Sequence, residues 1–580
     1  MPFSFSLLPY QALLLIIQVV QPVISSEQMR EIDRLTVEQF ETPSLLLMEA
    51  AANAALSSIA RHFSRDLSDK KALVLCGPGN NGGDGAALAR ALWQAGANTN
   101  VVLFGEIEQT RGDANTNFSA VRRLASFEAG STTAPSPLSF VECESVTAWE
   151  EIARPRRTFD IIVDALFGTG LTRPLEGVFR QVVEHLLLIR DARDRASGAR
   201  PLIVSLDVPS GLNADSAQPI GEAVRADLTI TFTAPKPANV LPPASHYGGE
   251  LVVANIGSPA ALLEAANSKL FVAEPNDARD WLARTRYTPD SHKNTHGHAL
   301  VIAGSRDYSG AAALCGNAVI RSGAGLVTVA TPASAQASVA ARAMPEVMTT
   351  ALAETDRGAV SDEAVDHVLQ LASRASVIAI GPGLTAEDER TRRFVRSVVE
   401  RRTTPIVIDA DGLNCLAPWP EALRGSQAAP LILTPHPGEM LRLMGATDKT
   451  VLADAVSAAR DFATKHEVIL LLKGSRSLIA APDGRVFVNP TGNAGLGTAG
   501  AGDTLTGIIT GFMAQAFANR NASDSEWVNA LDTTIAALYV GGLAGDFAAQ
   551  KFGMRAMVAS DIRDHFSAAI RSLDNEGELP

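Results

Sequence analysis

Residues 76–85 read CGPGNNGGDG and directly follow the apolar run ALVL at residues 72–75. An apolar run that ends in a glycine-rich turn is typical of a buried strand that passes into a helix. Gly77, Gly79 and Gly82 match G-x-G-x-x-G, the fingerprint of dinucleotide-binding turns, and Glu106 lies near the end of the next strand as its acidic partner. Because glycine-rich turns are common, this match alone leaves an ordinary dinucleotide-dependent dehydrogenase open.

The stretch continues past the fingerprint into NNGGDG, which adds the carboxylate of Asp84. The glycines leave backbone N–H groups unshielded, and we expect a helix to begin near Gly85. Free amides at the start of a helix favour an anion such as a phosphate. The dinucleotide fingerprint alone does not need this carboxylate. The role of Asp84 therefore has to be inferred together with the loops that surround it.

Apolar runs bounded by glycine or proline alternate with helical segments along the whole chain. Two helices are predicted first: one begins at a capping box formed by Ser25 and Gln28, and the other covers 43–62. Strands are then predicted at 71–76, 100–105, 159–166, 201–208, 226–232 and 249–256. Further strands are predicted at 299–303, 326–330, 376–380, 405–409, 430–433, 468–472 and 477–481, with helices at 311–324, 361–372 and 503–517 among them. This alternation predicts doubly wound α/β sheets.

The length of 580 residues exceeds what one hydrophobic core supports. We expect an apolar N-terminal extension at 1–24, one α/β domain at 25–265, a helical connection without a strong strand at 266–284, and a second α/β domain at 285–575. Ligands of such sheets bind beyond the carboxyl ends of the strands. The unusual loops of this chain cluster there.

The extension has the hydropathy of a signal peptide in its run LLPYQALLLIIQVVQPVIS. No Lys or Arg precedes that run, no A-x-A site follows it, and Gln11, Gln18 and Pro22 interrupt it. It is also too short and broken to span a bilayer. We therefore expect an upstream start codon or a disordered tail in preference to a signal or an anchor.

The composition narrows the class of partner. A net charge of −13 disfavours nucleic acid and anionic membranes as partners. The four cysteines lie far apart and form no C-x-x-C, which disfavours zinc and disulfide scaffolds and fits a cytoplasmic protein. We also expect a homo-oligomer, although no residue pattern sets its size.

Two further loops accompany the glycine turn in the first domain, VDALFGTGLTRP at 163–174 and DVPSGLNAD at 207–215. Asp164 and Asp207 each end a predicted strand, where an ionised carboxylate is costly without a cation or several donors. Each could instead be a helix cap. With Ser210 they offer hard oxygen ligands without Cys or His, which favours an alkali or alkaline-earth ion. Lys236, in TFTAPKP, could pair with an anion or be solvated.

The motifs NNGGDG, VDALFGTGL, DVPSGL and TFTAPKP, in this order, resemble the NAD(P)H-hydrate epimerase domain of the YjeF N-terminal type, a Rossmann-like fold. The resemblance covers residues 25–260 and implies interconversion of the R and S hydrates of the nicotinamide ring, with bound K⁺. It implies that Asp207 contacts the reacting ring and that K⁺ is held by Asn81, Asp164 and Ser210. The implied substrate-binding residues are Asn80, Asn81, Gly82, Gly83, Asp84, Gly168, Thr169, Gly170, Leu171, Thr172, Arg173, Pro174 and Asp207.

The second half contains NPTGNAGLGTAGAGDTLTGIITGF, in which Gly497, Gly500 and Gly502 precede Asp503. Amides at the start of a helix would stabilise a phosphoryl group, with Asp503 beside them as a base. No G-x-x-x-x-G-K-[ST] occurs in the chain, which excludes a P-loop enzyme. A glycine-rich turn capped by Asp503 is the structural alternative.

With AIGPGL, LTPHPGEM and LLKGSRS, this stretch resembles the ADP-dependent NAD(P)H-hydrate dehydratase domain of the ribokinase-like superfamily, over residues 285–575. The resemblance implies NAD(P)H hydrate and ADP as ligands, Mg²⁺ as the metal and Asp503 as the base; the choice of ADP over ATP comes from the resemblance alone. The implied hydrate-binding residues are Ala311, Gly383, His436 and Asp503. The implied nucleotide-binding residues are Lys473, Gly474, Ser475, Arg476, Ser477 and Gly502.

Together the two resemblances imply bifunctional repair of hydrated nicotinamide cofactors. Two other functions stay open from the residues. The second domain could be a kinase for a small alcohol such as a vitamin precursor, because the glycine loop and Asp503 serve that reaction equally. The first domain could be a dinucleotide-binding module without activity.

Overall fold

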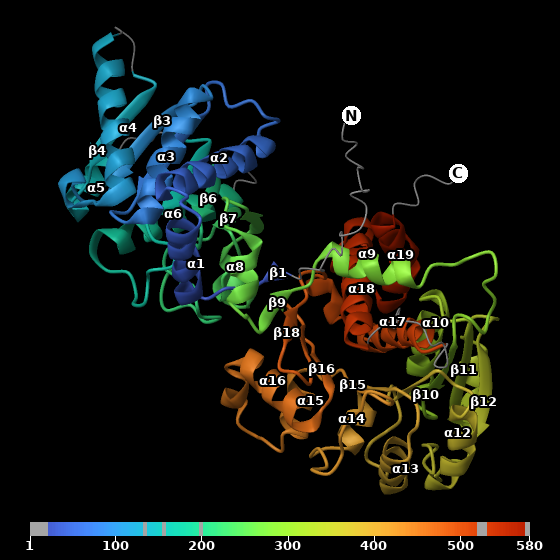
Figure 1. Cartoon of the computed structure of the whole chain (residues 1–580). Coiled ribbons are helices and arrows are strands. Elements are labelled where there is room, and N and C mark those ends of the chain that lie inside the picture. Colours follow the sequence, from blue (N-terminus) through green and yellow to red (C-terminus); the bar gives the residue numbers. More distant parts are fainter. Residues whose placement is uncertain (1–20, 132–135, 154–157, 196–200, 519–529, 575–580) are drawn as a thin grey trace, which may run out of the picture.

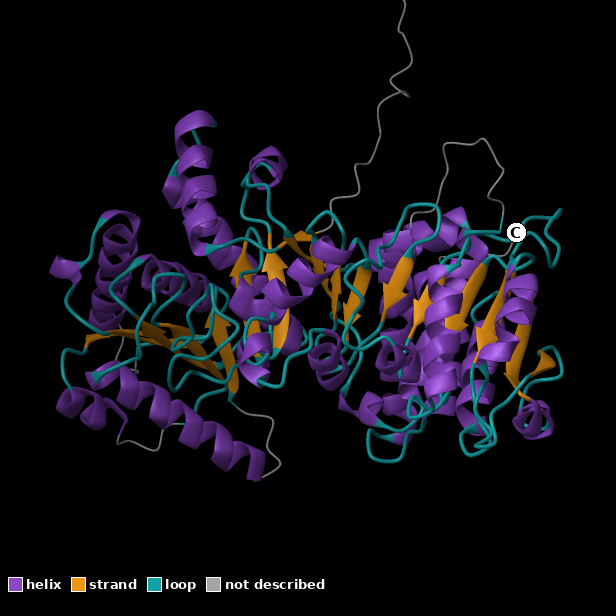
Figure 2. Cartoon of the chain, turned by 90° about the horizontal axis from the view of Figure 1, so that it is seen from below, coloured by secondary structure: helices purple, strands orange, loops and turns teal. Residues whose placement is uncertain are grey.

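The computed structural model describes residues 21–131, 136–153, 158–195, 201–518 and 530–574. Figures 1 and 2 show two α/β bodies, each a twisted sheet with helices on both faces. This confirms the predicted fold class. The proposed boundaries at 265 and 285 stay predictions. Within the described ranges, every helix is either too short or too polar to cross a membrane.

In the described part of the first body, seven parallel strands lie in the order β4-β3-β2-β5-β6-β7-β8. Their bounds are β2 Lys71–Cys76, β3 Asn98–Leu103, β4 Leu138–Glu142, β5 Ile161–Ala165, β6 Leu202–Leu206, β7 Leu228–Phe232 and β8 Glu250–Ala254. The helices are α1 Ser26–Gln39, α2 Ser44–His62, α3 Asn80–Gln94, α4 Gly112–Ser131, α5 Val146–Ala153, α6 Gly177–Arg195, α7 Pro237–Val240 and α8 Ala260–Ala265, with 3-10 turns η1 Ile107–Gln109 and η2 Ala244–Tyr247. The predicted capping box of Ser25 and Gln28 opens α1.

The described second sheet has the order β1-β9-β18-β17-β16-β15-β14-β13-β10-β11-β12. Its strands are β1 Gln21–Pro22, β9 Leu270–Val272, β10 His298–Ile302, β11 Leu326–Pro332, β12 Met348–Leu352, β13 Val377–Ile380, β14 Ile406–Ile408, β15 Leu431–Leu433, β16 Ile469–Leu472, β17 Leu478–Ala480 and β18 Val486–Val488. Only β1/β9, β16/β17 and β17/β18 pair antiparallel among these described strands. All strands predicted for this half are present.

The helices of the second body are α9 Pro275–Arg284, α10 Ser309–Arg321, α11 Ala333–Ala340, α12 Val365–Ala372, α13 Glu389–Glu400, α14 Asp411–Cys415, α15 Pro437–Leu443, α16 Ala455–His466, α17 Ala501–Ala516, α18 Ala530–Phe552 and α19 Ala559–Leu573. Short 3-10 turns lie at η3 Asp362–Ala364, η4 Lys449–Leu452 and η5 Ala494–Gly497. Successive strand residues feed the two sides of the sheet: Val301 packs under α17 and α18, whereas Leu300 and Ile302 pack on the opposite face. Both faces are therefore closed, as parallel sheets require.

One expectation about the junction was wrong. Residues 21–24, assigned to a tail, are ordered: Gln21 and Pro22 form β1 against β9, and the Val23 N–H donates to the Leu270 carbonyl at 2.8 Å. The segment at 266–284, expected to be helical without a strong strand, contains the helix α9 and the three-residue strand β9, which pairs with β18. Both strands are too short for their periodicity to be visible in the sequence. They lie between the two bodies in Figure 1, so the start of the first body is hydrogen-bonded to the sheet of the second.

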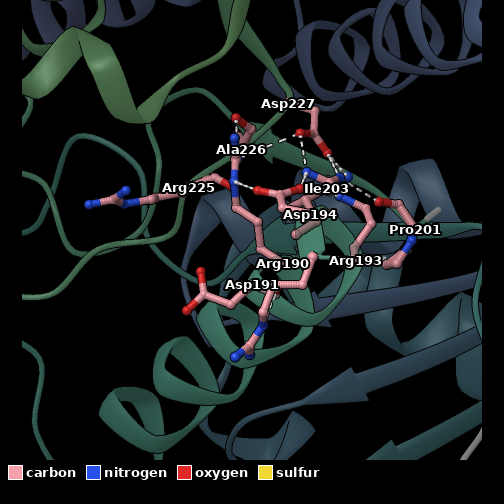
Figure 3. A network of polar contacts seen from close by, with 10 residues as sticks. Arg190, Asp191, Arg193, Asp194, Pro201, Ile203, Arg225, Ala226 and Asp227 are labelled. Atoms are coloured by element: carbon pink, nitrogen blue, oxygen red, sulfur yellow. Dashed lines mark hydrogen bonds and ion pairs between the residues drawn. The ribbon is translucent and has the colours of Figure 1, made fainter. Parts of the chain in front are cut away.

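A network of ion pairs and hydrogen bonds around Arg193 and Asp227 lies at the amino-terminal end of the first sheet (Figure 3). Arg193 of α6 donates from Nη2 to Asp227 Oδ1 at 2.9 Å, and Asp227 also accepts the N–H of Ile203 at 2.9 Å. The Arg193 side chain is only 9% exposed. This pair ties α6 to the starts of β6 and β7, at the end of the sheet away from the cavity described next.

Candidate active sites

A cavity of about 800 Å³ opens beyond the carboxyl ends of the strands of the first sheet. Its walls come from α1 and α2, from the start of α3, and from the loops that follow β5, β6 and β7. Of the residues proposed for substrate binding, the cavity brings together Asn80, Asn81, Asp84, Gly168, Thr169, Gly170 and Asp207. The position agrees with the rule that ligands of open α/β sheets bind at this edge.

Asp207 directly follows β6 and has a left-handed φ of 65°, a backbone conformation that is rare outside glycine and common at functional sites. Its Oδ1 accepts hydrogen bonds from Lys236 Nζ at 2.5 Å and from Thr231 Oγ1 at 3.0 Å. The Lys236 side chain is 1% exposed, so the open alternative for this lysine resolves in favour of pairing with a carboxylate. Two donors hold Oδ1, which leaves Oδ2 to face the cavity.

Gly168 makes room for that free oxygen. A Cβ on this residue would lie 3.0 Å from Asp207 Oδ2 and 3.4 Å from Asn81 Oδ1. The glycine therefore marks the point where the loop after β5 passes closest to both side chains. In the loop at 168–170, which was predicted to be a flexible anion-binding loop, Gly168 is therefore also needed because a side chain there would crowd Asp207 and Asn81.

Of the side chains proposed to hold K⁺, Asn81 has unmet hydrogen-bonding capacity, whereas Asp164 and Ser210 are hydrogen-bonded to each other. Both amide atoms of Asn81 are shielded from solvent and have no hydrogen-bond partner in the described chain. Asp164 is fully buried and accepts from Ser210 Oγ at 2.5 Å and Ser205 Oγ at 2.8 Å, with no Lys or Arg of the described residues in an ion pair with it. Burial raises the pKa of Asp164, and the hydrogen bonds oppose that rise. The backbone N–H groups of Leu166 and Ser210 also donate to Asp164. The unpartnered amide of Asn81, with a buried carboxylate that pairs with no Lys or Arg of the described residues, fits a monovalent cation held by hard oxygen ligands.

The glycine-rich stretch forms helix, where a turn was expected. Helix α3 begins at Asn80, five positions before the predicted start. A Cβ on Gly82 would lie 1.8 Å from the Gly77 carbonyl oxygen, and one on Gly85 would lie 2.6 Å from Ala165 Cβ. These glycines therefore permit close packing of α3 on the sheet, and the pattern was misread because glycine disfavours helix interiors.

The carboxylate in this stretch, Asp84, is part of the cavity wall. It lines the cavity from the second turn of α3, and burial, together with the charges of Asp207 and Asp33, raises its pKa well above the usual range. The remaining predicted contacts lie outside the cavity lining: Gly82 and Gly83 are buried residues of α3, Leu171 packs in the core, and Thr172, Arg173 and Pro174 are exposed. Their proposed role in substrate binding stays a prediction.

The second candidate site lies where β14, β16 and α17 meet. Asp409, which directly follows β14, is 1% exposed and accepts from Lys473 Nζ at 2.8 Å and from Thr506 Oγ1 at 2.7 Å. Glu439 lies 4.0 Å from the same lysine. Lys473, expected to meet phosphates, therefore contacts a buried carboxylate. The sequence analysis missed Asp409, although it ends a strand in the same way as Asp164 and Asp207.

Asp503 lies in the first turn of α17, next to this pair. Gly500 caps the helix with φ of 82°, and a Cβ on Gly502 would come within 3.6 Å of Lys473 Nζ. Burial and the charge of Asp409 raise the pKa of Asp503 to about 6, while Lys473 opposes the rise. A carboxylate whose pKa lies near neutrality at a helix N-terminus is suited to accept a proton.

The other predicted contacts surround this centre. His436 caps α15: its Nδ1 accepts from Gly438 N–H at 3.0 Å, and its side chain is 52% exposed. A Cβ on Gly383 would lie 3.1 Å from Ala311 Cβ, so these two residues are adjacent. In the loop at 473–477, the Gly474 N–H donates to Ser477 Oγ at 3.3 Å, Ser475 is exposed, and burial lowers the pKa of Arg476.

The fold and the two sites define the class of protein: a two-domain α/β enzyme with one carboxylate-lined site at each sheet. Residues 44–238 match the family described as YjeF-related protein N-terminus, and residues 299–567 match NAD(P)H-hydrate dehydratase. The chain belongs to the family of bifunctional NAD(P)H-hydrate repair enzymes. The member from Moorella thermoacetica is 37% identical over 96% of this chain and 98% of its own length, and that from Thermofilum pendens is 37% identical over 95% and 96%.

The ADP/ATP-dependent NAD(P)H-hydrate dehydratase from Bacillus subtilis, co-crystallised with ATP and Mg²⁺, is 27% identical. It covers 52% of this chain and 98% of its own, with a TM-score of 0.43.

Proposed function

We propose that the chain repairs hydrated NAD(P)H in two steps: it interconverts the R and S hydrates in the first cavity and dehydrates the S hydrate at the second site at the expense of ADP. The family membership of nearly the whole chain carries this proposal. The pairing also makes chemical sense, because a dehydratase that accepts only S leaves R behind. An epimerase on the same chain converts that R hydrate into the S hydrate that the dehydratase uses.

Epimerisation at C6 of the ring requires that a C–O bond opens and closes on opposite faces. The ring nitrogen assists departure of the hydroxyl and leaves an iminium-like cation. Asp207 is suited to stabilise that cation, because Lys236 and Thr231 fix its Oδ1 and leave Oδ2 directed past Gly168 into the cavity. A fixed carboxylate costs no reorganisation when the charge develops.

The proposed K⁺ would be held by Asn81, Asp164 and Ser210. Its charge would neutralise the buried Asp164 and satisfy the amide of Asn81. Bound there, it would supply a fixed positive charge near the ring and the diphosphate. The N–H groups at the start of α3 present further donors to an anion.

At the second site Asp503 accepts the proton of the ring hydroxyl while the hydroxyl oxygen receives the phosphoryl group from ADP. Positioning and charge stabilisation supply most of the rate enhancement in such transfers. Lys473, held by Asp409, and the amides at the start of α17 present positive potential to the nucleotide phosphates. Elimination of phosphate then restores the dihydronicotinamide ring.

A divalent ion is expected from the chemistry of phosphoryl transfer. In the described chain no group of three or more His, Cys, Asp or Glu side chains is arranged to hold a metal. This fits Mg²⁺, which is commonly held by phosphates with one or two carboxylates. Asp409 and Glu439 are the buried acids beside Lys473 that could serve.

The test incubates the chain with a mixture of R and S NADH hydrates, with and without ADP, and follows the return of the reduced-nicotinamide absorbance. We expect complete recovery that depends on ADP. Recovery that stops at the S fraction would remove the epimerase assignment. A stable phosphorylated product without recovery would instead support a small-molecule kinase.

A further inference from the structure

A carboxylate that no motif of the sequence indicates also lines the first cavity. Asp33 lies on α1, between Met29 and Val37, which line the same wall. Its Oδ1 is shielded from solvent and has no hydrogen-bond partner among the described residues. A buried ionised oxygen without a donor is costly, so this geometry favours the protonated acid.

The neighbours of Asp33 agree with that protonation state. Burial raises the pKa of Asp33, the charge of Lys236 opposes that rise and the charge of Asp207 adds to it, and the resulting pKa is about 6. Lys236 has no hydrogen to spare for Asp33, because its three donors serve Asp207, Thr231 and the Phe232 carbonyl. The other charged side chains that line the cavity are Asp84 of α3, Asp113 of α4, and Arg30, Arg34 and Glu38 of α1.

The cavity therefore contains one carboxylate held by a lysine and one acid with an unpaired oxygen, on two different elements. An epimerase that moves a hydroxyl between two faces of a ring needs a proton donor on one face and an acceptor on the other. One side chain reaches one face. We propose that Asp33 is the second acid–base group of epimerisation, paired with Asp207; this inference rests on the proposed function.

The proton balance closes with these two groups. In one direction Asp33 gives its proton to the C6 hydroxyl, the C6–O bond breaks, and water leaves with the bonding pair. The lone pair of the ring nitrogen forms the C=N bond of the cation. A second water attacks C6 from the other face, the new C6–O bond forms, and Asp207 accepts the surplus proton. One water is released and one is consumed, and exchange with solvent returns the proton to Asp33.

The test compares Asp33→Asn with Glu27→Gln, an exposed carboxylate in the first turn of the same helix, outside the cavity. We expect Asp33→Asn to slow conversion of the R hydrate by about 100-fold or more. ADP-dependent dehydration of the S hydrate, which uses the other domain, should stay within about twofold as a check on folding. Glu27→Gln should leave both activities unchanged.

Two further readouts separate proton transfer from a structural role. Epimerisation by the unmodified enzyme should decline as the pH rises above about 6, because Asp33 loses its proton, and Asp33→Asn should lack this decline. Asp33→Glu should restore part of the activity, and Asp33→Asn should not lower the thermal midpoint. Epimerisation by Asp33→Asn within about threefold of the unmodified enzyme, or an equal loss in Glu27→Gln, would overturn the inference. No conversion by the unmodified enzyme would overturn the proposed function itself, and the inference with it.

Discussion

The two sites solve one electrostatic problem in different ways. At the first sheet Lys236 pairs with Asp207, the residue assigned to the reacting ring, and Asp33 is left with a raised pKa of about 6. At the second sheet Lys473 pairs with Asp409, and Asp503, the assigned base, has the raised pKa of about 6. The lysine therefore fixes the charge of the reacting carboxylate in one domain and of its neighbour in the other. The difference fits the proposed chemistry: Asp207 must be ionised while the ring cation forms, whereas Asp503 must take up the proton of the ring hydroxyl.

The strongest way to break this comparison is Asp503→Asn. An amide cannot accept the hydroxyl proton, so ADP-dependent dehydration of the S hydrate should fall by about 1000-fold. Epimerisation should be unchanged, because its cavity lies on the other sheet. The assay is single-turnover recovery of the reduced nicotinamide. Dehydration retained within tenfold would mean that Asp503 only caps the helix.

Lys236→Met tests the lysine of the first site. It leaves Asp207 buried without its cation, and breaking a buried ion pair costs about 3 kcal/mol. We expect the free energy of unfolding of the first domain to fall by that amount in denaturant titration. Arg180→Met, which removes exposed ion pairs with Glu184 and Glu222, serves as the control and should cost less than about 1 kcal/mol. Equal losses in both variants would contradict the assigned pairing.

The pH dependence of dehydration sharpens the role of Asp503. A base must be ionised, so the rate should fall about tenfold per pH unit below about 6. The sign for stability is opposite: because the folded pKa is raised, protonation favours the fold, and stability decreases as the pH rises from about 4 through about 6. Asp503→Asn should therefore stabilise the second domain at pH 8 and not at pH 4. Thermal unfolding at the two values measures this.

The smallest effect is expected for Gly168→Ala. The added Cβ would press on Asp207 Oδ2 at 3.0 Å, so epimerisation should fall by roughly tenfold while folding is retained. Gly170→Ala also adds a methyl group to the cavity wall, but its Cβ meets nothing within 4 Å, so the difference between the two variants isolates the contact with Asp207. Similar rates for the two variants would show that Oδ2 does not act in the cavity.

Most of the architecture was predictable because buried parallel strands are written as apolar runs. The run at 71–76 matches β2 residue for residue. The missed strands lack that pattern: β4 and β12 are edge strands with half-exposed residues, and β9 and β18 have three residues each. Strands of this kind form through long-range pairing, which a local window does not contain.

The sites were predictable where a polar residue ends an apolar run, as at Asp207. The same pattern at Asp409 went unused. Asp33 could not be found in this way, because an acid on an amphipathic helix looks like a solvated residue until the fold turns it inward. Tertiary contacts also decided whether Lys236 is paired or solvated.

Asp207→Asn decides whether two separate carboxylate sites act on one hydrated coenzyme. Purified R hydrate is incubated with ADP and either the unmodified chain or this variant, with S hydrate as the parallel substrate. We expect the unmodified chain to restore NADH from both hydrates, whereas Asp207→Asn restores it from the S hydrate alone. Equal recovery of NADH from the R hydrate by both proteins would show that Asp207 does not act in epimerisation.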